Sequence, residues 1–290
     1  MNTYGEQRIR EIVELVNRSE ISSIKKTVKE ILQLIMDENS SAKDLKDIIE
    51  RDPPLCSRLL KRANSASYGY PKTIGDIQEA IVCIGFDAVK ELALSQKVCE
   101  LFKKDDIVNG YSRKGLWKHC SAVAICSKMI YRREFGEHGD KIYVAGLLHD
   151  LGIIVEDQFF QWHFEQALEK ACLENTNLSL VEKEFLLVDH TEIGRAIAED
   201  WDFPEELGAA LGFHHQPDLA PEDFERNVLT VFVADYICQR EKIGYGDAPY
   251  TDEALFRSCL VELDVREKAL GIILEELKEE IHKLEQTDWF

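Results

Sequence analysis

The stretch Tyr143-Val-Ala-Gly-Leu-Leu-His-Asp-Leu-Gly152 places a histidine and an aspartate side by side in otherwise apolar sequence. An unpaired charge is costly to bury, so polar residues in such a place belong either to a hydrogen-bonded core network or to a metal site. On its own the His149-Asp150 pair is a weak signal, because adjacent His and Asp are common by chance. The other polar residues on apolar faces of the chain decide between the two interpretations.

Helical spacing of apolar residues dominates the whole chain, and no convincing alternating strand pattern is present. We therefore predict an all-α fold, a two-lobed helical bundle. The expected divisions are an N-terminal amphipathic helix at 1–20, a helical lobe at 21–102, a second lobe at 112–240, and a charged helical tail at 241–290. A polar, turn-rich segment at 103–113 is expected to join the two lobes.

The second lobe is predicted to contain six helices, at 114–135, 140–155, 158–175, 180–200, 204–213 and 226–241. Ser41 with Asp44, and Ser179 with Glu182, have the spacing of capping boxes that begin helices.

Composition limits the class of protein. The chain has 290 residues, 45% of them apolar and 31% charged, which is typical of a soluble globular protein. Its net charge of −19 argues against binding a nucleic-acid backbone, which needs a basic face, but allows a small phosphorylated ligand held by metal ions. The sequence shows no signal-peptide core and no run long enough to span a membrane, and its eight scattered cysteines suit reduced thiols. We expect a cytoplasmic protein without a membrane partner.

Three polar residues occupy positions where helix packing calls for an apolar side chain. His119 shares a face with Leu116 and Val123, His190 lies between Leu186 and Ile193, and Asp235 lies among Val228, Val231, Phe232 and Cys238. Any one of them is more often a hydrogen-bonded core residue than a ligand. The interpretation changes for the complete set, because burying five histidines and two aspartates without a cation would demand an elaborate network. The set is His119, His149, Asp150, His190, His214, His215 and Asp235.

Imidazole and carboxylate ligands suit divalent transition metals, Fe or Mn first, with Zn, Ni and Co as further candidates. These ligands are too many for one ion and suitable for two ions that share a bridging carboxylate. Two such ions with two aspartates leave a site of about +2, which attracts an anionic oxygen such as that of phosphate.

The order of these residues resembles the metal-ligand pattern of the HD-domain phosphohydrolases, in the extended form of the HD-GYP branch. The first half is similar to the HDOD (HD-related output) domains of bacterial signalling proteins. The marks of that family are Asp52-Pro53, Leu59-Leu60, Ala63-Asn64-Ser65, Ala80-Ile81 and Ile84-Gly85, followed by Glu182, Gly194, Trp201, Pro204 and the His-His pair. The resemblance covers roughly residues 20–240, so the HDOD domain is expected at 21–240, with an HD-like metal-binding lobe at 112–240.

The resemblance implies one ion held by His119, His149, Asp150 and Asp235, and a second held by Asp150, His190, His214 and His215. Asp150 would bridge the two ions and is the candidate catalytic residue.

The chain departs from the HD-GYP pattern at three places. Ile153 stands where that branch has a lysine, and Gly115 stands where it has an acidic residue. The branch has its Gly-Tyr-Pro triplet just after the His-His pair, where this chain reads Gln216-Pro217-Asp218-Leu219. The Gly-Tyr-Pro at 69–71 lies in the other lobe, and we interpret it as coincidence.

Three functions fit the sequence. The first is a bacterial signal-transduction protein that is also a metal-dependent phosphohydrolase or phosphodiesterase, acting on a small nucleotide-type substrate. The second is a non-catalytic output module whose metals are structural or regulatory. The third, and weakest, is a di-iron oxygenase. The expected partner is a small phosphate-bearing ligand or a signalling protein, with a homodimer as a further option.

Overall fold

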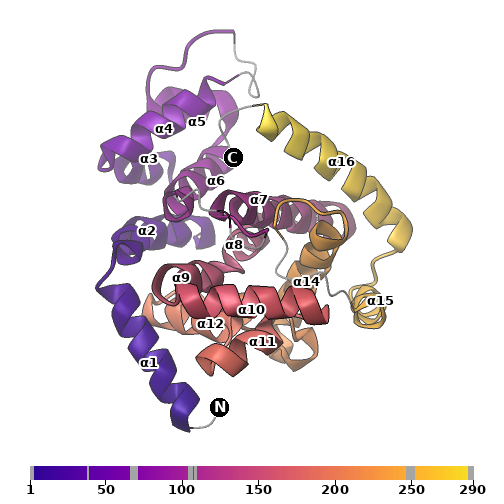
Figure 1. The fold of residues 1–290 in the computed structure, drawn as a ribbon. Coiled ribbons are helices and arrows are strands. Elements are labelled where there is room, and N and C mark those ends of the chain that lie inside the picture. The colour runs from indigo at the N-terminus through magenta and orange to yellow at the C-terminus, as the bar shows by residue number, and fades with distance from the viewer. Residues whose placement is uncertain are drawn as a thin grey trace.

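The computed structural model describes residues 3–37, 39–65, 71–103, 107, 110–245 and 252–286. Helices make up most of these residues and no strand occurs among them, which confirms the predicted all-α class (Figure 1). No helix in the described ranges is long and apolar enough to cross a membrane.

The first group of helices packs around α6. It comprises α2 (Lys25–Met36), α3 (Ala42–Glu50), α4 (Pro53–Ala63), α5 (Ile77–Ile84) and α6 (Phe86–Val98), with short 3-10 turns at Glu20–Ile24 and Cys99–Phe102. The predicted capping box begins α3: Ser41 accepts from the backbone N–H of Asp44, and the Asp44 side chain accepts from the backbone N–H of Ser41. In Figure 1 this group lies at the upper left, in the violet part of the ribbon.

The second group is built on α7, which packs against α8, α14 and α16. Its helices are α7 (Arg113–Ile130, extended by a π-helical turn at Tyr131–Phe135), α8 (Asp140–Leu148), α9 (Leu151–Phe159), α10 (Gln161–Glu174), α11 (Leu178–Leu186), α12 (His190–Asp200), α13 (Glu205–Phe213), α14 (Glu225–Arg240), α15 (Glu253–Glu262) and α16 (Glu267–Glu285). Short 3-10 turns at Pro217–Leu219 and Glu222–Phe224 join α13 to α14. These helices surround the polar cluster described below.

The N-terminal helix α1 (Thr3–Asn17) packs against α12, so the start of the chain joins the second group (Figure 1). Its apolar face buries Ile12 and Val16. At the end of the helix, Asn17 Nδ2 donates a 2.9 Å hydrogen bond to Asp200 Oδ2, and Lys25 Nζ lies 3.0 Å from the same oxygen. The N-terminal helix thus packs against a late segment of the chain.

Two predicted helices are each two helices in the structure. The helix expected at 140–155 is interrupted, because α8 ends at Leu148 and α9 begins at Leu151. The break holds His149 and Asp150, and Asp150 leaves helical geometry with φ −95° and ψ 21°. Apolar periodicity continues across this point, so the pattern alone conceals the break.

The helix expected at 180–200 is interrupted after Leu186, where Leu187 adopts a left-handed φ of 70°. The predicted Ser179–Glu182 capping box is wrong: α11 is capped by Asn177, whose side chain accepts from the N–H of Ser179. A capping box forms instead at the start of α12, between Asp189 and Glu192. His190 is therefore the first residue of α12 rather than a mid-helix residue on one stripe with Leu186.

Candidate metal centre

Five segments bring the seven predicted site residues into one buried cluster. His119 comes from the first half of α7, His149 and Asp150 from the break between α8 and α9, and His190 from the first turn of α12. The remaining residues are His214 and His215, just after α13, and Asp235 in α14. All of them are buried except His215, which is partly buried.

The first half of the cluster surrounds one oxygen of Asp150. Oδ2 of Asp150 lies 3.2 Å from Nε2 of His149 and 3.9 Å from Nε2 of His119. Nε2 of His119 also lies 2.9 Å from Oδ1 of Asp235. His119, His149 and Asp150 can each offer a ligand atom within 4.8 Å of the others. This spacing allows one cation to touch all three.

The second half surrounds the other oxygen of Asp150. Oδ1 lies 3.5 Å from Nε2 of His214 and 3.7 Å from Nε2 of His190. Nε2 of His215 lies 3.1 Å from Nε2 of His190, which completes a second set of four candidate ligands. Each carboxylate oxygen of Asp150 therefore faces a different group of imidazoles, the arrangement expected of a bridging ligand.

Hydrogen bonds at Nδ1 turn three of the imidazoles so that Nε2 points into the cluster. Nδ1 of His149 lies 2.8 Å from the carbonyl oxygen of Gly146, and Nδ1 of His214 lies 3.0 Å from that of Leu211. Nδ1 of His190 lies 2.8 Å from Oε2 of Glu182. Metal-binding histidines commonly donate their second N–H to a carbonyl or carboxylate in this way.

The protonation states suit metal ligands. Burial, and then the neighbouring His215, lower the pKa of His214 to about 4, so its ring is neutral near pH 7. Burial opposes ionisation of Asp150, but the surrounding imidazoles, led by His149, lower the pKa of that carboxyl well below its usual range. Neutral imidazole and ionised carboxylate are the forms that bind a metal.

Three buried atoms of the cluster have no hydrogen-bond partner among the described residues: Nε2 of His149, Nε2 of His214 and Oδ1 of Asp150. Buried polar atoms are nearly always satisfied, so unpartnered lone pairs that converge on one place fit a cation. The residues present therefore fit a metal site.

Glu182 is a residue whose role sequence reasoning missed. It is fully buried in α11, it accepts from both the backbone N–H and Nδ1 of His190, and it does not serve as a capping partner. Fully buried Glu156 lies nearby, and burial together with the charge of Glu182 raises the pKa of Glu156 well above its usual range. Glu156 is therefore harder to ionise than an exposed glutamate. Because these contacts join three helices, no local pattern could have indicated them.

The structure explains two departures from the HD-GYP pattern. Ile153 is completely buried in the core, so the position of the missing lysine does not face solvent. Gly115 lies under the segment at Tyr245, whose N–H donates a 2.9 Å hydrogen bond to the carbonyl of Gly115. A Cβ on Gly115 would lie 3.0 Å from Oγ of Ser112 and 3.3 Å from Cβ of Tyr245, so a larger residue at this position would press on both neighbours. Of the triplet at 69–71, residues Gly69 and Tyr70 lie outside the described ranges.

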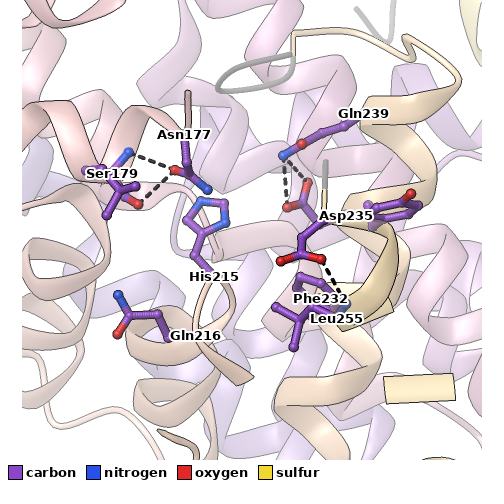
Figure 2. A pocket seen from close by; sticks show the side chains of 11 residues that line it. Asn177, Ser179, His215, Gln216, Phe232, Asp235, Gln239 and Leu255 are labelled. Atoms are coloured by element: carbon purple, nitrogen blue, oxygen red, sulfur yellow. Dashed lines mark hydrogen bonds between the residues drawn. The ribbon is translucent and has the colours of Figure 1, made fainter. Parts of the chain in front are cut away.

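A cavity of about 160 Å³ opens beside the cluster (Figure 2). His215 and Asp235 both line it, and these residues belong to opposite halves of the cluster. Figure 2 shows Gln239 above Asp235, where its amide donates to both carboxylate oxygens at 3.0 and 3.1 Å. The cavity gives a small ligand a route to an otherwise buried site.

Fold and site together define a class of protein: an all-α protein with a buried histidine–aspartate cluster where several helices meet. The HDOD domain family matches residues 21–217, and the chain belongs to that family. An uncharacterized protein from Treponema pallidum is 27% identical over 246 residues, which are 83% of this chain and 45% of that protein. The chain thus spans about half the length of this curated relative.

Solved structures share the fold. An HDOD domain protein of unknown function from Geobacter sulfurreducens is similar with a TM-score of 0.81 at 24% identity, over 98% of this chain and 99% of that one. A candidate signal transduction protein from Marinobacter aquaeolei has a TM-score of 0.76 at 19% identity, over 97% and 64% of the two chains. A candidate phosphohydrolase from Shewanella amazonensis has a TM-score of 0.69 at 22% identity, over 94% and 93%.

Proposed function

We propose that this HDOD protein is a two-metal phosphohydrolase that acts on a small phosphate ester. The observation that supports the proposal is the position of Asp150, whose two oxygens face separate groups of imidazoles. His119, His149, Asp150 and Asp235 would hold one ion, and Asp150, His190, His214 and His215 the other. When bound, such a pair of ions activates water and stabilises the charge that develops on a transferring phosphoryl group.

The chain's own residues prepare this chemistry. Glu182 fixes the ring of His190, and Gln239 fixes the carboxylate of Asp235 at the edge of the cavity. The apolar surroundings of His149 and Asp150 keep bulk water from these two side chains, and electrostatic interactions are stronger where water is excluded. The cavity then admits the phosphoryl group from the side of His215 and Asp235.

Metal content and phosphate release test this function. Protein expressed with Mn or Fe should hold two ions per chain and release the phenol from an aryl phosphate monoester or diester. Asp150→Ala should lose both the ions and the activity, because it removes the shared ligand. His282→Ala is the matched control, since its side chain is 70% exposed in α16, outside the cluster. Circular dichroism would establish that both variants fold. Full activity of Asp150→Ala would overturn the proposal.

One observation favours a second candidate, an output module with regulatory metals. Buried Ile153 replaces the lysine of the HD-GYP branch, so the site lacks a side-chain cation that the branch has at that position. Such a module would bind the two ions and a signalling partner without turnover. Stoichiometric metal with no phosphate release from a broad panel of esters would favour this alternative.

A further inference from the structure

The described walls of the cavity consist mostly of neutral side chains. Besides His215 and Asp235, its lining consists of neutral polar residues, apolar residues and one acid: Asn177, Ser179, Gln216 and Gln239; Leu180, Phe232, Tyr236 and Leu255; and Asp252. No lysine or arginine belongs to this lining in the part of the chain that the structure describes. Sites for polyphosphates neutralise each phosphate with Arg, Lys or a metal ion.

Burial extends this observation. The position that carries a lysine in the HD-GYP branch, 153, is a core isoleucine. As far as the described residues go, positive charge at this site would thus come from the metal ions alone. With Asp150 and Asp235 as ligands, two divalent ions leave about +2, which matches one phosphate dianion.

The dimensions restrict the ligand further. At about 160 Å³ the cavity is smaller than the pockets of about 300–1,000 Å³ that hold drug-sized molecules. Its neutral polar side includes Asn177, whose carbonyl oxygen accepts from Ser179 and whose amide nitrogen is turned towards His215 in Figure 2. Its apolar side includes Phe232 and Leu255. Such walls suit a short, uncharged organic group.

Asp252 is the acidic residue of the cavity lining that is not a candidate metal ligand. It caps α15, because its Oδ1 accepts from the backbone N–H of Leu255 at 2.9 Å. A second phosphate on a ligand would bring further negative charge into the same small cavity as this carboxylate. Repulsion between like charges in a partly desolvated space costs more than it does in bulk water.

We infer that the site takes a small phosphate monoester with an uncharged body, and that Asp252 selects against a second anionic group. Nucleoside diphosphates, nucleoside triphosphates and cyclic dinucleotides are then excluded as substrates. This inference rests on the proposed phosphohydrolase function, and it narrows the nucleotide-type substrate expected from the sequence to a smaller ester.

Binding of a matched pair of ligands to the Mn-loaded protein tests the inference. Methyl phosphate and methyl diphosphate share the same body and differ by one phosphate. Equilibrium dialysis and thermal unfolding give their dissociation constants, and metal analysis afterwards establishes that the ligand has not removed the ions. Methyl phosphate should bind more tightly than methyl diphosphate by roughly fivefold or more.

Asp252→Asn removes the negative charge of this side chain and keeps the helix cap, because asparagine also caps helices well. This variant should bring the two dissociation constants closer together by roughly threefold or more, while binding of methyl phosphate changes little. Asp223→Asn removes the same charge at an exposed position outside the cavity lining, and should leave the ratio unchanged.

Equal binding of the two ligands, or an unchanged ratio in Asp252→Asn, would overturn the inference and leave the phosphohydrolase proposal standing. Binding of neither ligand to protein with two ions per chain would overturn both. The readout is binding rather than turnover, so the two proposals fail in distinguishable ways.

Discussion

Gly152 in α9 lies against the backbone of His190 in α12: a Cβ on Gly152 would be 1.9 Å from the carbonyl oxygen of His190. No side chain fits at that distance, so the two helices meet backbone to backbone. Asp150 lies two residues before Gly152, and its Oδ1 is 3.7 Å from Nε2 of His190. The close approach of the helices therefore sets the separation of two candidate ligands.

Gly152→Ala should disrupt this packing. Because the added methyl group would clash with backbone, α9 and α12 must separate. The free energy of unfolding should fall by at least about 1–3 kcal/mol. The same movement should lower the metal content. Urea unfolding and metal analysis measure the two effects. Gly271→Ala in α16 is the control, since a Cβ there would meet nothing within 4 Å. It should be neutral or stabilising by up to about 1 kcal/mol. Similar behaviour of the two variants would contradict this account.

Glu182→Gln should weaken metal binding without unfolding the protein. Glutamine can still accept from Nδ1 of His190, but it lacks the negative charge that makes the imidazole a stronger ligand. Loss of such a partner typically reduces metal affinity about 10–100-fold. Competition with a chromogenic chelator measures the affinity. Glu184→Gln, which alters a side chain 55% exposed on the same helix, should bind metal as the unmodified protein does. Unchanged affinity in Glu182→Gln would show that this contact is only structural.

Removing metal should destabilise the protein. The cluster buries unpartnered atoms of His149, His214 and Asp150, which a cation would satisfy. A metal at 100 times its dissociation constant stabilises the folded state by about 2.7 kcal/mol per site. A chelator should therefore lower Tm, and added Mn should restore it. Asp150→Ala should respond to neither treatment. A Tm that is insensitive to chelator in the metal-loaded protein would argue against binding at this cluster.

Sequence patterns were sufficient for the helical class. His119 and Asp235 lie on buried helix faces, as the patterns indicate. His190 reaches the cluster from the first turn of α12 rather than from the predicted stripe with Leu186. The patterns were insufficient for the breaks at 149–150 and 187–189. Apolar spacing continues through both breaks. Gly152 packs against His190 just after the first break, and a left-handed turn at Leu187 ends the helix at the second.

The contacts of Glu182 also depend on tertiary structure. A glutamate three residues after a serine matches a capping box locally, yet Asn177 takes the cap and Glu182 turns inward to His190. Local hydrogen-bonding rules describe the contacts that a side chain can make. The contacts that Glu182 actually makes depend on helices distant in the sequence.

Glu91 in α6 should make stability fall as pH rises through the neutral range. Burial raises its pKa to about 7, even though Lys128 contacts it; the same lysine lies 3.2 Å from Oδ1 of Asp140. In the unfolded chain Glu91 has its ordinary pKa of 4.5. Between these two values the folded protein holds a proton that the unfolded chain has released, so folding stability decreases as pH rises from about 4.5 to about 7.

Glu91→Gln removes this titration while it keeps the shape of the side chain. The stability of the unmodified protein relative to this variant should therefore decline by about 1–3 kcal/mol between pH 5 and pH 8. Urea unfolding at a series of pH values measures the difference, and the titration of the histidine cluster cancels because both proteins contain it. Asp140 does not interfere, because Lys128 lowers the pKa of that carboxyl against the opposing effect of burial, which places its titration below this window. A difference between the two proteins that stays constant with pH would show that Glu91 is already ionised when buried, with its charge balanced by Lys128.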